Sequence, residues 1–121
     1  MNQITESELE IMKVLWKLNS ATSAQIIENL ENISDWKPKT IQTLITRLVA
    51  KEAIEVDKSN KKSYIYCPKI SEDQYKNYAN ESFLKKLYNG SINLMLSSFI
   101  KDKKLSKEDI DDLKKLLEED N

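Results

Sequence analysis

The stretch KPKTIQTLITRLVAK, residues 37–51, decides how this chain folds. Its apolar residues recur at the i, i+3, i+4, i+7 and i+8 spacing of an amphipathic helix: Ile41, Leu44, Ile45, Leu48 and Val49. Pro38 suits the first turn of such a helix, where its missing N–H costs nothing. The pattern therefore predicts a helix from Pro38 to about Lys51, with one face packed against a core.

The opposite face of this predicted helix is polar and carries no acid. The stretch holds four cations, although the whole chain has 19 basic and 20 acidic residues. Hydroxyls, amides and cations are the groups that contact base edges and phosphates in DNA. We interpret this face as a candidate DNA-binding surface, with an ordinary solvated helix face as the alternative. Its residues are Lys37, Lys39, Thr40, Gln42, Thr43, Thr46, Arg47 and Lys51.

Side-chain chemistry separates base contacts from phosphate contacts on this surface. Gln42 can pair with adenine through two hydrogen bonds, and the methyl groups of Thr43 and Thr46 can meet thymine methyls. Lys39 and Thr40, in the first turn, are expected to contact phosphate. Arg47 lies two turns into the helix and suits either role.

Two capping boxes predict the helices before this stretch. Thr5-Glu6-Ser7-Glu8 begins a helix that runs to about Leu18, whose inward residues are Leu9, Met12, Leu15 and Trp16. Thr22-Ser23-Ala24-Gln25 begins a shorter helix that ends near Asn32. We interpret Trp16 and Trp36 as packing residues rather than as base-stacking platforms.

After Lys51 the apolar pattern changes from a helical period to the alternation of strands. Residues 53–57 and 63–67 predict a β-hairpin, and the polar tract 58–62 predicts its turn. Three helices followed by a hairpin make a winged helix-turn-helix, whose third helix enters the major groove of DNA. The wing supplies three further candidate DNA contacts, with a solvated hairpin tip as the alternative: Lys58, Lys61 and Lys62.

The rest of the chain predicts three helices, at about residues 72–88, 92–101 and 107–119. A module this small rarely stabilises itself, so we expect its apolar stripes to be buried against a second copy of the chain. The expected dimerisation residues are Phe83, Leu84, Leu87, Leu94, Met95, Phe99, Ile110, Leu113, Leu116 and Leu117. The predicted fold is mainly α with a small β-hairpin: a winged-helix domain in residues 1–70 and a helical dimerisation region in residues 71–121.

Composition and charge narrow the function classes. No apolar run approaches the roughly 20 residues of a membrane helix, and the net charge is −1. Residues 36–66, however, hold seven bases and three acids, a localised footprint for a polyanion. With no histidine and one cysteine, Cys67, we expect no enzymatic activity, metal or cofactor. A single cysteine also fits a reducing cytoplasm.

Several segments resemble the BlaI/MecI penicillinase-repressor family. Residues 38–48 are similar to its recognition helix, residues 8–16 to its first helix and residues 82–90 to its early dimerisation segment. Leu105-Ser106, followed by Glu108, Ile110 and Leu113, resembles its last helix. The resemblance covers essentially the whole chain. It implies a cytoplasmic homodimeric repressor that binds TACA/TGTA palindromes in front of genes for a β-lactamase or a resistant penicillin-binding protein.

The resemblance also implies a mode of inactivation. In that family a membrane sensor protease detects the β-lactam, and the repressor is cut at an Asn-Phe bond in its dimerisation region. Ser98-Phe99 is the matching position here, with the Phe kept and the Asn replaced. Lys37 stands where the family has a capping serine, and so forgoes a cap worth about 1 kcal/mol. Two alternatives remain: a repressor of the same family that answers another signal, and a winged-helix protein-interaction adapter.

Overall fold

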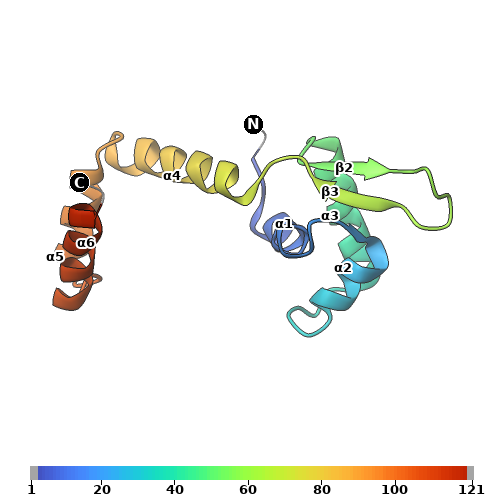
Figure 1. The fold of residues 1–121 in the computed structure, drawn as a ribbon, viewed down its shortest axis with the longest axis horizontal. Helices are drawn as coiled ribbons and strands as arrows, with labels where there is room; N and C mark the ends of the chain where they lie inside the picture. Colours follow the sequence, from blue (N-terminus) through green and yellow to red (C-terminus); the bar gives the residue numbers. More distant parts are fainter. Residues whose placement is uncertain (1–2, 120–121) are drawn as a thin grey trace. The chain divides into compact units, whose positions relative to one another are not determined.

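The computed structural model describes residues 3–119, which form six helices and a three-stranded sheet (Figure 1). This content confirms the predicted fold class, mainly α with a small β-hairpin. The chain divides into two compact units, Met1–Tyr75 and Lys76–Asn121. No helix in the described range is long and apolar enough to cross a membrane.

The first unit begins with helices where the capping boxes predict them. Its elements are α1 (Glu6–Leu18), β1 (Ala21–Thr22), α2 (Ser23–Leu30), α3 (Pro38–Ala50), β2 (Ile54–Asp57) and β3 (Ile65–Pro68). Thr5 Oγ1 accepts the Glu8 N–H at 3.1 Å, and Glu8 Oε1 accepts the Thr5 N–H at 2.9 Å. The same reciprocal pair joins Thr22 and Gln25. Both helix starts are therefore set by local side-chain to backbone bonds.

The core of this unit forms around the inner face of α3. Its four buried side chains, as predicted, are Ile41, Leu44, Ile45 and Leu48. In α1 the apolar residues that are fully enclosed are Ile11, Met12, Val14 and Leu15, whereas Leu9 and Trp16 are only partly buried. The four residues predicted to face inward all lie in or against the core, but the prediction missed Ile11 and Val14, because α1 packs against α2, α3 and β3 together and so buries a broader face.

The sheet has the order β1-β3-β2, with both neighbouring pairs antiparallel. The predicted hairpin is present, but β3 begins at Ile65, later than predicted. Backbone N–H groups of Ser59 and Lys62 donate to the side chains of Asp57 and Asn60, at 2.9 and 3.0 Å, and these local turns lengthen the loop. Strand β1, which pairs with β3 through Ala21 and Thr22, was not predicted from the sequence.

The second unit contains α4 (Glu72–Tyr88), which begins in the first unit, α5 (Ile92–Lys101) and α6 (Lys107–Glu119). All three lie at their predicted positions. The first turn of α4 packs on α1, where the Trp16 and Tyr75 rings lie 5.7 Å apart and Trp16 Nε1 donates to the Ile70 carbonyl at 3.0 Å. None of the three helices has a buried side chain among the described residues.

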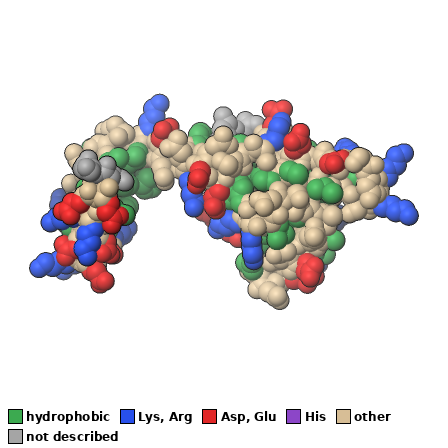
Figure 2. All heavy atoms as spheres, in the orientation of Figure 1, with side chains coloured by type: hydrophobic (Ala, Val, Ile, Leu, Met, Phe, Trp, Pro, Cys, Tyr) green, Lys and Arg blue, Asp and Glu red, His purple; other side chains and the backbone are tan. Residues whose placement is uncertain are grey.

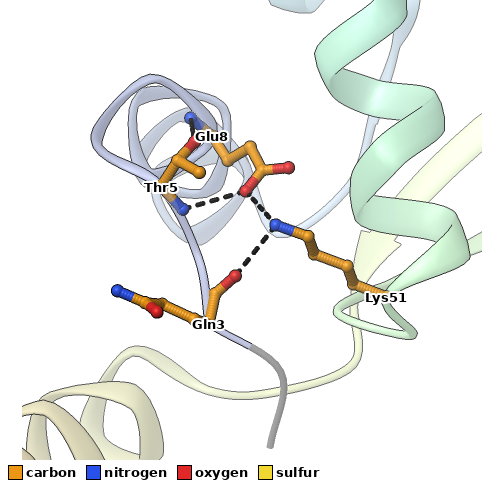
Figure 3. Close-up of polar contacts among 4 residues, drawn as sticks. All are labelled: Gln3, Thr5, Glu8 and Lys51. Atoms are coloured by element: carbon orange, nitrogen blue, oxygen red, sulfur yellow. Dashed lines mark hydrogen bonds and ion pairs between the residues drawn. The ribbon is translucent and has the colours of Figure 1, made fainter.

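Glu8 is a fully buried carboxylate that joins the start of α1 to the end of α3 (Figure 3). Its Oε1 lies 2.5 Å from Lys51 Nζ, which also donates to the Gln3 carbonyl at 2.8 Å. Burial raises the pKa of Glu8, but the hydrogen bonds from Lys51 and Thr5 and the Lys51 charge outweigh it, so the pKa lies below its ordinary value. Oε2 has no hydrogen-bond partner in the described structure.

We expect Glu8→Gln to lower the free energy of unfolding at pH 7 by about 1–3 kcal/mol, because a charged hydrogen bond is lost in a buried site. Folding lowers the pKa of Glu8, so its contribution is present above the ordinary pKa of 4.5 and is lost as pH falls through the lower folded value. Urea denaturation between pH 7 and pH 3 should show the gap between wild type and variant closing in acid. A gap independent of pH would contradict this assignment. Glu10→Gln is the control, since Glu10 pairs with Lys13 at the surface, where an ion pair contributes little to stability.

The end of α3 holds a non-glycine residue in the left-handed conformation, Glu52, with φ of 63°. The Glu52 N–H donates to the Val49 carbonyl and the Ala53 N–H to the Leu48 carbonyl, both at 3.0 Å, as in a Schellman motif. Since this conformation costs an L-residue about 1–2 kcal/mol, Glu52→Gly should raise the free energy of unfolding by about 0.5–1 kcal/mol in thermal denaturation. Glu52→Ala keeps the backbone strain and should not raise the free energy of unfolding. An equal increase in both variants would assign the effect to removal of the Glu52 charge.

Candidate nucleic-acid interface

The exposed face of α3 carries six of the predicted contact residues: Lys39, Thr40, Gln42, Thr43, Thr46 and Arg47. Lys37, the N-cap, is also exposed and makes no side-chain cap hydrogen bond, as its identity predicts. Burial of the four apolar residues on the other side fixes the rotation of α3 about its axis. The polar face is thus a rigid surface about 12 Å long from Lys39 to Arg47, given the 1.5 Å rise per helical residue.

The threonines on this face differ in how their hydroxyls are used. Thr43 Oγ1 donates to the Lys39 carbonyl and Thr46 Oγ1 to the Gln42 carbonyl, each at 3.0 Å. The Thr40 side chain has no hydrogen-bond partner within residues 3–119. The hydroxyl protons of Thr43 and Thr46 are therefore held by the helix itself, while that of Thr40 is available to a ligand.

Lys51 is placed differently from the other cations of the stretch. It lies seven residues after Leu44 and three after Leu48, which puts it on the inner face of α3 rather than on the polar face. Its ammonium bonds Glu8 and Gln3. We therefore leave Lys51 out of the interface. The spacing of Lys51 from Leu44 and Leu48 already indicated in the sequence that it belongs to the inner face, but the prediction considered only its charge.

The wing carries the remaining predicted cations, Lys58, Lys61 and Lys62, and all three are exposed. Figure 2 shows Lys and Arg side chains at the tip of the β2–β3 hairpin. Lys58 Nζ lies 5.7 Å from the centre of the Tyr64 ring, a distance suited to a cation–π contact. Hydrogen bonds from the Ser59 hydroxyl and N–H lower the pKa of Asp57 at the base of the turn.

A polar hollow lies between the start of α2, the exposed face of α3 and the wing. Its lining residues are Thr22, Ser23, Ala24, Gln42, Lys61, Lys62, Ser63, Tyr64 and Tyr66. A helix N-terminus presents backbone N–H groups and a partial positive charge, and here it faces the same hollow as two lysines. The arrangement suits an anionic group such as a DNA phosphate. The residues of α2 and Tyr64 were not among the contacts predicted from charge and periodicity. The capping box at Thr22 was the signal in the sequence that a helix N-terminus lies here.

The expected dimerisation residues carry apolar side chains that are largely uncovered. Phe83, Leu87, Leu94, Leu113, Leu116 and Leu117 are between 41% and 67% exposed. Leu84, Met95, Phe99 and Ile110 are half-buried, as is Ser98. The candidate cleavage bond Ser98-Phe99 lies inside α5, and the Ser98 carbonyl accepts the Asp102 N–H at 3.0 Å. Within residues 3–119, no three His, Cys, Asp or Glu side chains are grouped so as to hold a metal ion.

Comparison with known proteins identifies the family. Residues 4–119 match the family model described as "Penicillinase repressor". The chain belongs to the penicillinase repressor family. It is 41% identical over 117 residues to the penicillinase repressor of Bacillus licheniformis, covering 97% of this chain and 91% of that protein. It is 35% identical over 115 residues to the methicillin resistance regulatory protein MecI of Staphylococcus aureus strain N315, covering 95% and 93%. The resemblance found in the sequence is confirmed.

Two solved structures of relatives show the same winged-helix fold. One is the solution structure of the DNA-binding domain of the repressor BlaI, at 40% identity and a TM-score of 0.53; the match covers 62% of this chain and 94% of that one. Another is monomeric Bacillus licheniformis BlaI in complex with the blaP half-operator, at 42% identity and a TM-score of 0.54. That match covers 61% of this chain and 89% of that one.

Proposed function

We propose that this family member is a homodimeric, sequence-specific transcriptional repressor that binds double-stranded DNA through α3 and the wing. The observation that carries the proposal is the division of α3 into a buried apolar face and an exposed, acid-free polar face. A helix buried on one side and presenting cations, hydroxyls and an amide on the other matches what a major groove requires. The complex of a relative at 42% identity with a half-operator supports DNA as the ligand.

The proposed contacts divide by chemistry. Gln42 and Arg47 project from the middle of the exposed face and suit base edges. Lys37 and Lys39 stand at the first turn, where the positive end of the helix dipole also favours phosphate. Lys58, Lys61 and Lys62 would hold the backbone beside the groove. In this arrangement the phosphate contacts set the register of the protein on DNA, and the central contacts choose the sequence.

The proposed homodimer forms through the second unit. Its three helices leave large apolar side chains exposed, such as Leu116 at 58% and Leu117 at 67%, and their burial against a second copy would stabilise both. A two-fold dimer would place two α3 helices on successive turns of DNA, about 34 Å apart. A palindromic operator follows from that symmetry, and the family resemblance favours TACA/TGTA half-sites.

The proposed target genes are those of β-lactam resistance. The proposed location of the protein is the cytoplasm, where the DNA lies. Two relatives, a penicillinase repressor and a methicillin resistance regulatory protein, support this choice of genes. Release from DNA would follow cleavage by a membrane-bound sensor protease in the second unit, with Ser98-Phe99 as the candidate bond. Because that bond lies in a helix, α5 would have to open locally before a protease could reach it.

DNA binding is tested with a labelled TACA/TGTA palindrome and a scrambled duplex of equal composition, at several salt concentrations. We expect a large preference for the palindrome and an affinity that falls steeply with salt, because phosphate contacts release counterions. Gln42→Ala or Arg47→Ala should each cost about 1–3 kcal/mol at a base contact. Lys13→Ala on α1 is the matched control. Full affinity in both α3 variants would refute the assigned face, and a flat salt response would favour a protein adapter.

Dimerisation is tested by placing a charge on the exposed stripe of α6. Leu113→Asp and Leu116→Asp should each yield monomers in sedimentation velocity and weaken operator binding, because each half-site loses its linked partner. Lys115→Asp, on the opposite side of the same helix, should leave the dimer intact. Dimers that persist in both leucine variants would place the interface elsewhere.

A further inference from the structure

The exposed face of α3 presents three threonines whose side chains are not equivalent. Thr43 and Thr46 each donate their hydroxyl proton to a carbonyl four residues back, at 3.0 Å. Thr40, in the first turn, has no such partner in the part of the chain that the structure describes. All three side chains are exposed and lie on the surface that the proposed function assigns to DNA.

The two bonded hydroxyls limit what Thr43 and Thr46 can offer to a base. Their protons are already used, so donation to an acceptor such as thymine O4 would require breaking a helix-side bond. The group that remains for an apolar contact is the Cγ2 methyl. Residues three apart are neighbours on a helix surface, so the spacing places Thr43 and Thr46 next to each other on the face that also carries Gln42. In the major groove, the 5-methyl of thymine is the apolar feature that distinguishes bases.

We infer that Thr43 and Thr46 recognise thymine through its 5-methyl group, while Thr40 binds a DNA phosphate through its free hydroxyl. This inference rests on the proposed function and specifies which atoms provide its specificity. Thr40 suits the phosphate role because it stands in the first turn next to Lys39 and close to Lys37, where cations and the helix N-terminus favour an anion. Threonines on one helix face therefore have two different tasks.

The first experiment removes the methyl group from the DNA alone. Each thymine of the TACA/TGTA palindrome is replaced in turn by deoxyuridine, which keeps the base pair and every hydrogen-bonding group. The dissociation constant of the wild-type protein is then measured at fixed salt. We expect at least one thymine position in each half-site to lose about three- to fourfold in affinity, the effect of one buried methyl. The scrambled duplex with the same replacements should show no change.

The second experiment substitutes valine or serine for each threonine. Valine should preserve binding at Thr43 and Thr46 and weaken it at Thr40, and serine should do the reverse. At Thr43 and Thr46, valine keeps a methyl and should preserve both affinity and sensitivity to deoxyuridine, whereas serine removes it and should lower both. At Thr40, serine keeps the hydroxyl and should preserve affinity. Thr40→Val should weaken binding about tenfold, equally for thymine and deoxyuridine duplexes, since a hydrogen bond to a charged group is lost. Circular dichroism and thermal melting confirm that each variant is folded.

The outcomes separate this inference from the proposed function. Equal affinity for the palindrome and the scrambled duplex overturns both. Preference for the palindrome without any deoxyuridine effect overturns the methyl recognition alone. Loss of affinity in both Thr43→Val and Thr46→Val, as large as in the serine variants, shows that the oxygens accept hydrogen bonds from bases and also overturns it. Unchanged binding by Thr40→Val overturns the phosphate contact.

Discussion

Burial of one face of α3 is the constraint on which the rest of the first unit depends. Ile41, Leu44, Ile45 and Leu48 are each at most 5% exposed, and fully burying such side chains contributes about 1.5–3 kcal/mol apiece. That sum is several times larger than the cap that Lys37 fails to provide, worth about 1 kcal/mol. Packing, rather than local helix signals, therefore fixes where α3 lies and how it is rotated. The polar face is exposed as a consequence, before any ligand is considered.

The Glu8–Lys51 pair follows the same constraint at the end of α3. Because Lys51 lies on the inner face, its partly buried side chain reaches the carboxylate of Glu8, which also caps α1. A buried carboxylate is costly unless donors surround it, and here two donors bond the same oxygen. The pair thus makes the junction between α1 and α3 specific more than it makes it strong. It also removes one positive charge from the surface available to DNA.

Sequence patterns predicted what is encoded locally and missed what depends on distant partners. The capping boxes at Thr5 and Thr22, Pro38 and the apolar periods gave helix positions that the structure confirms to within a residue or two, because those signals lie inside each element. Strand β1 has only two residues, too few to show any period. It exists because β3 pairs with it from 43 to 45 positions away, Thr22 with Ile65 and Ala21 with Tyr66. The role of Lys51 depends on Glu8, 43 residues distant, so its charge alone was misleading. The hydrogen bonds of the Thr43 and Thr46 hydroxyls depend on side-chain rotamers, which no sequence pattern specifies.

The two units differ in what stabilises them, and that difference would allow a change in the second unit to alter DNA affinity without unfolding the first. The first unit has its own core, whereas α4, α5 and α6 have no buried side chain among the described residues. In the proposed homodimer, affinity for a palindrome comes from linking two modest half-site contacts, a gain of about 10²–10⁴. Damage to α5 would remove that gain without altering a single residue of α3. A cut in the weakly packed unit would therefore release DNA while the winged-helix unit stays folded.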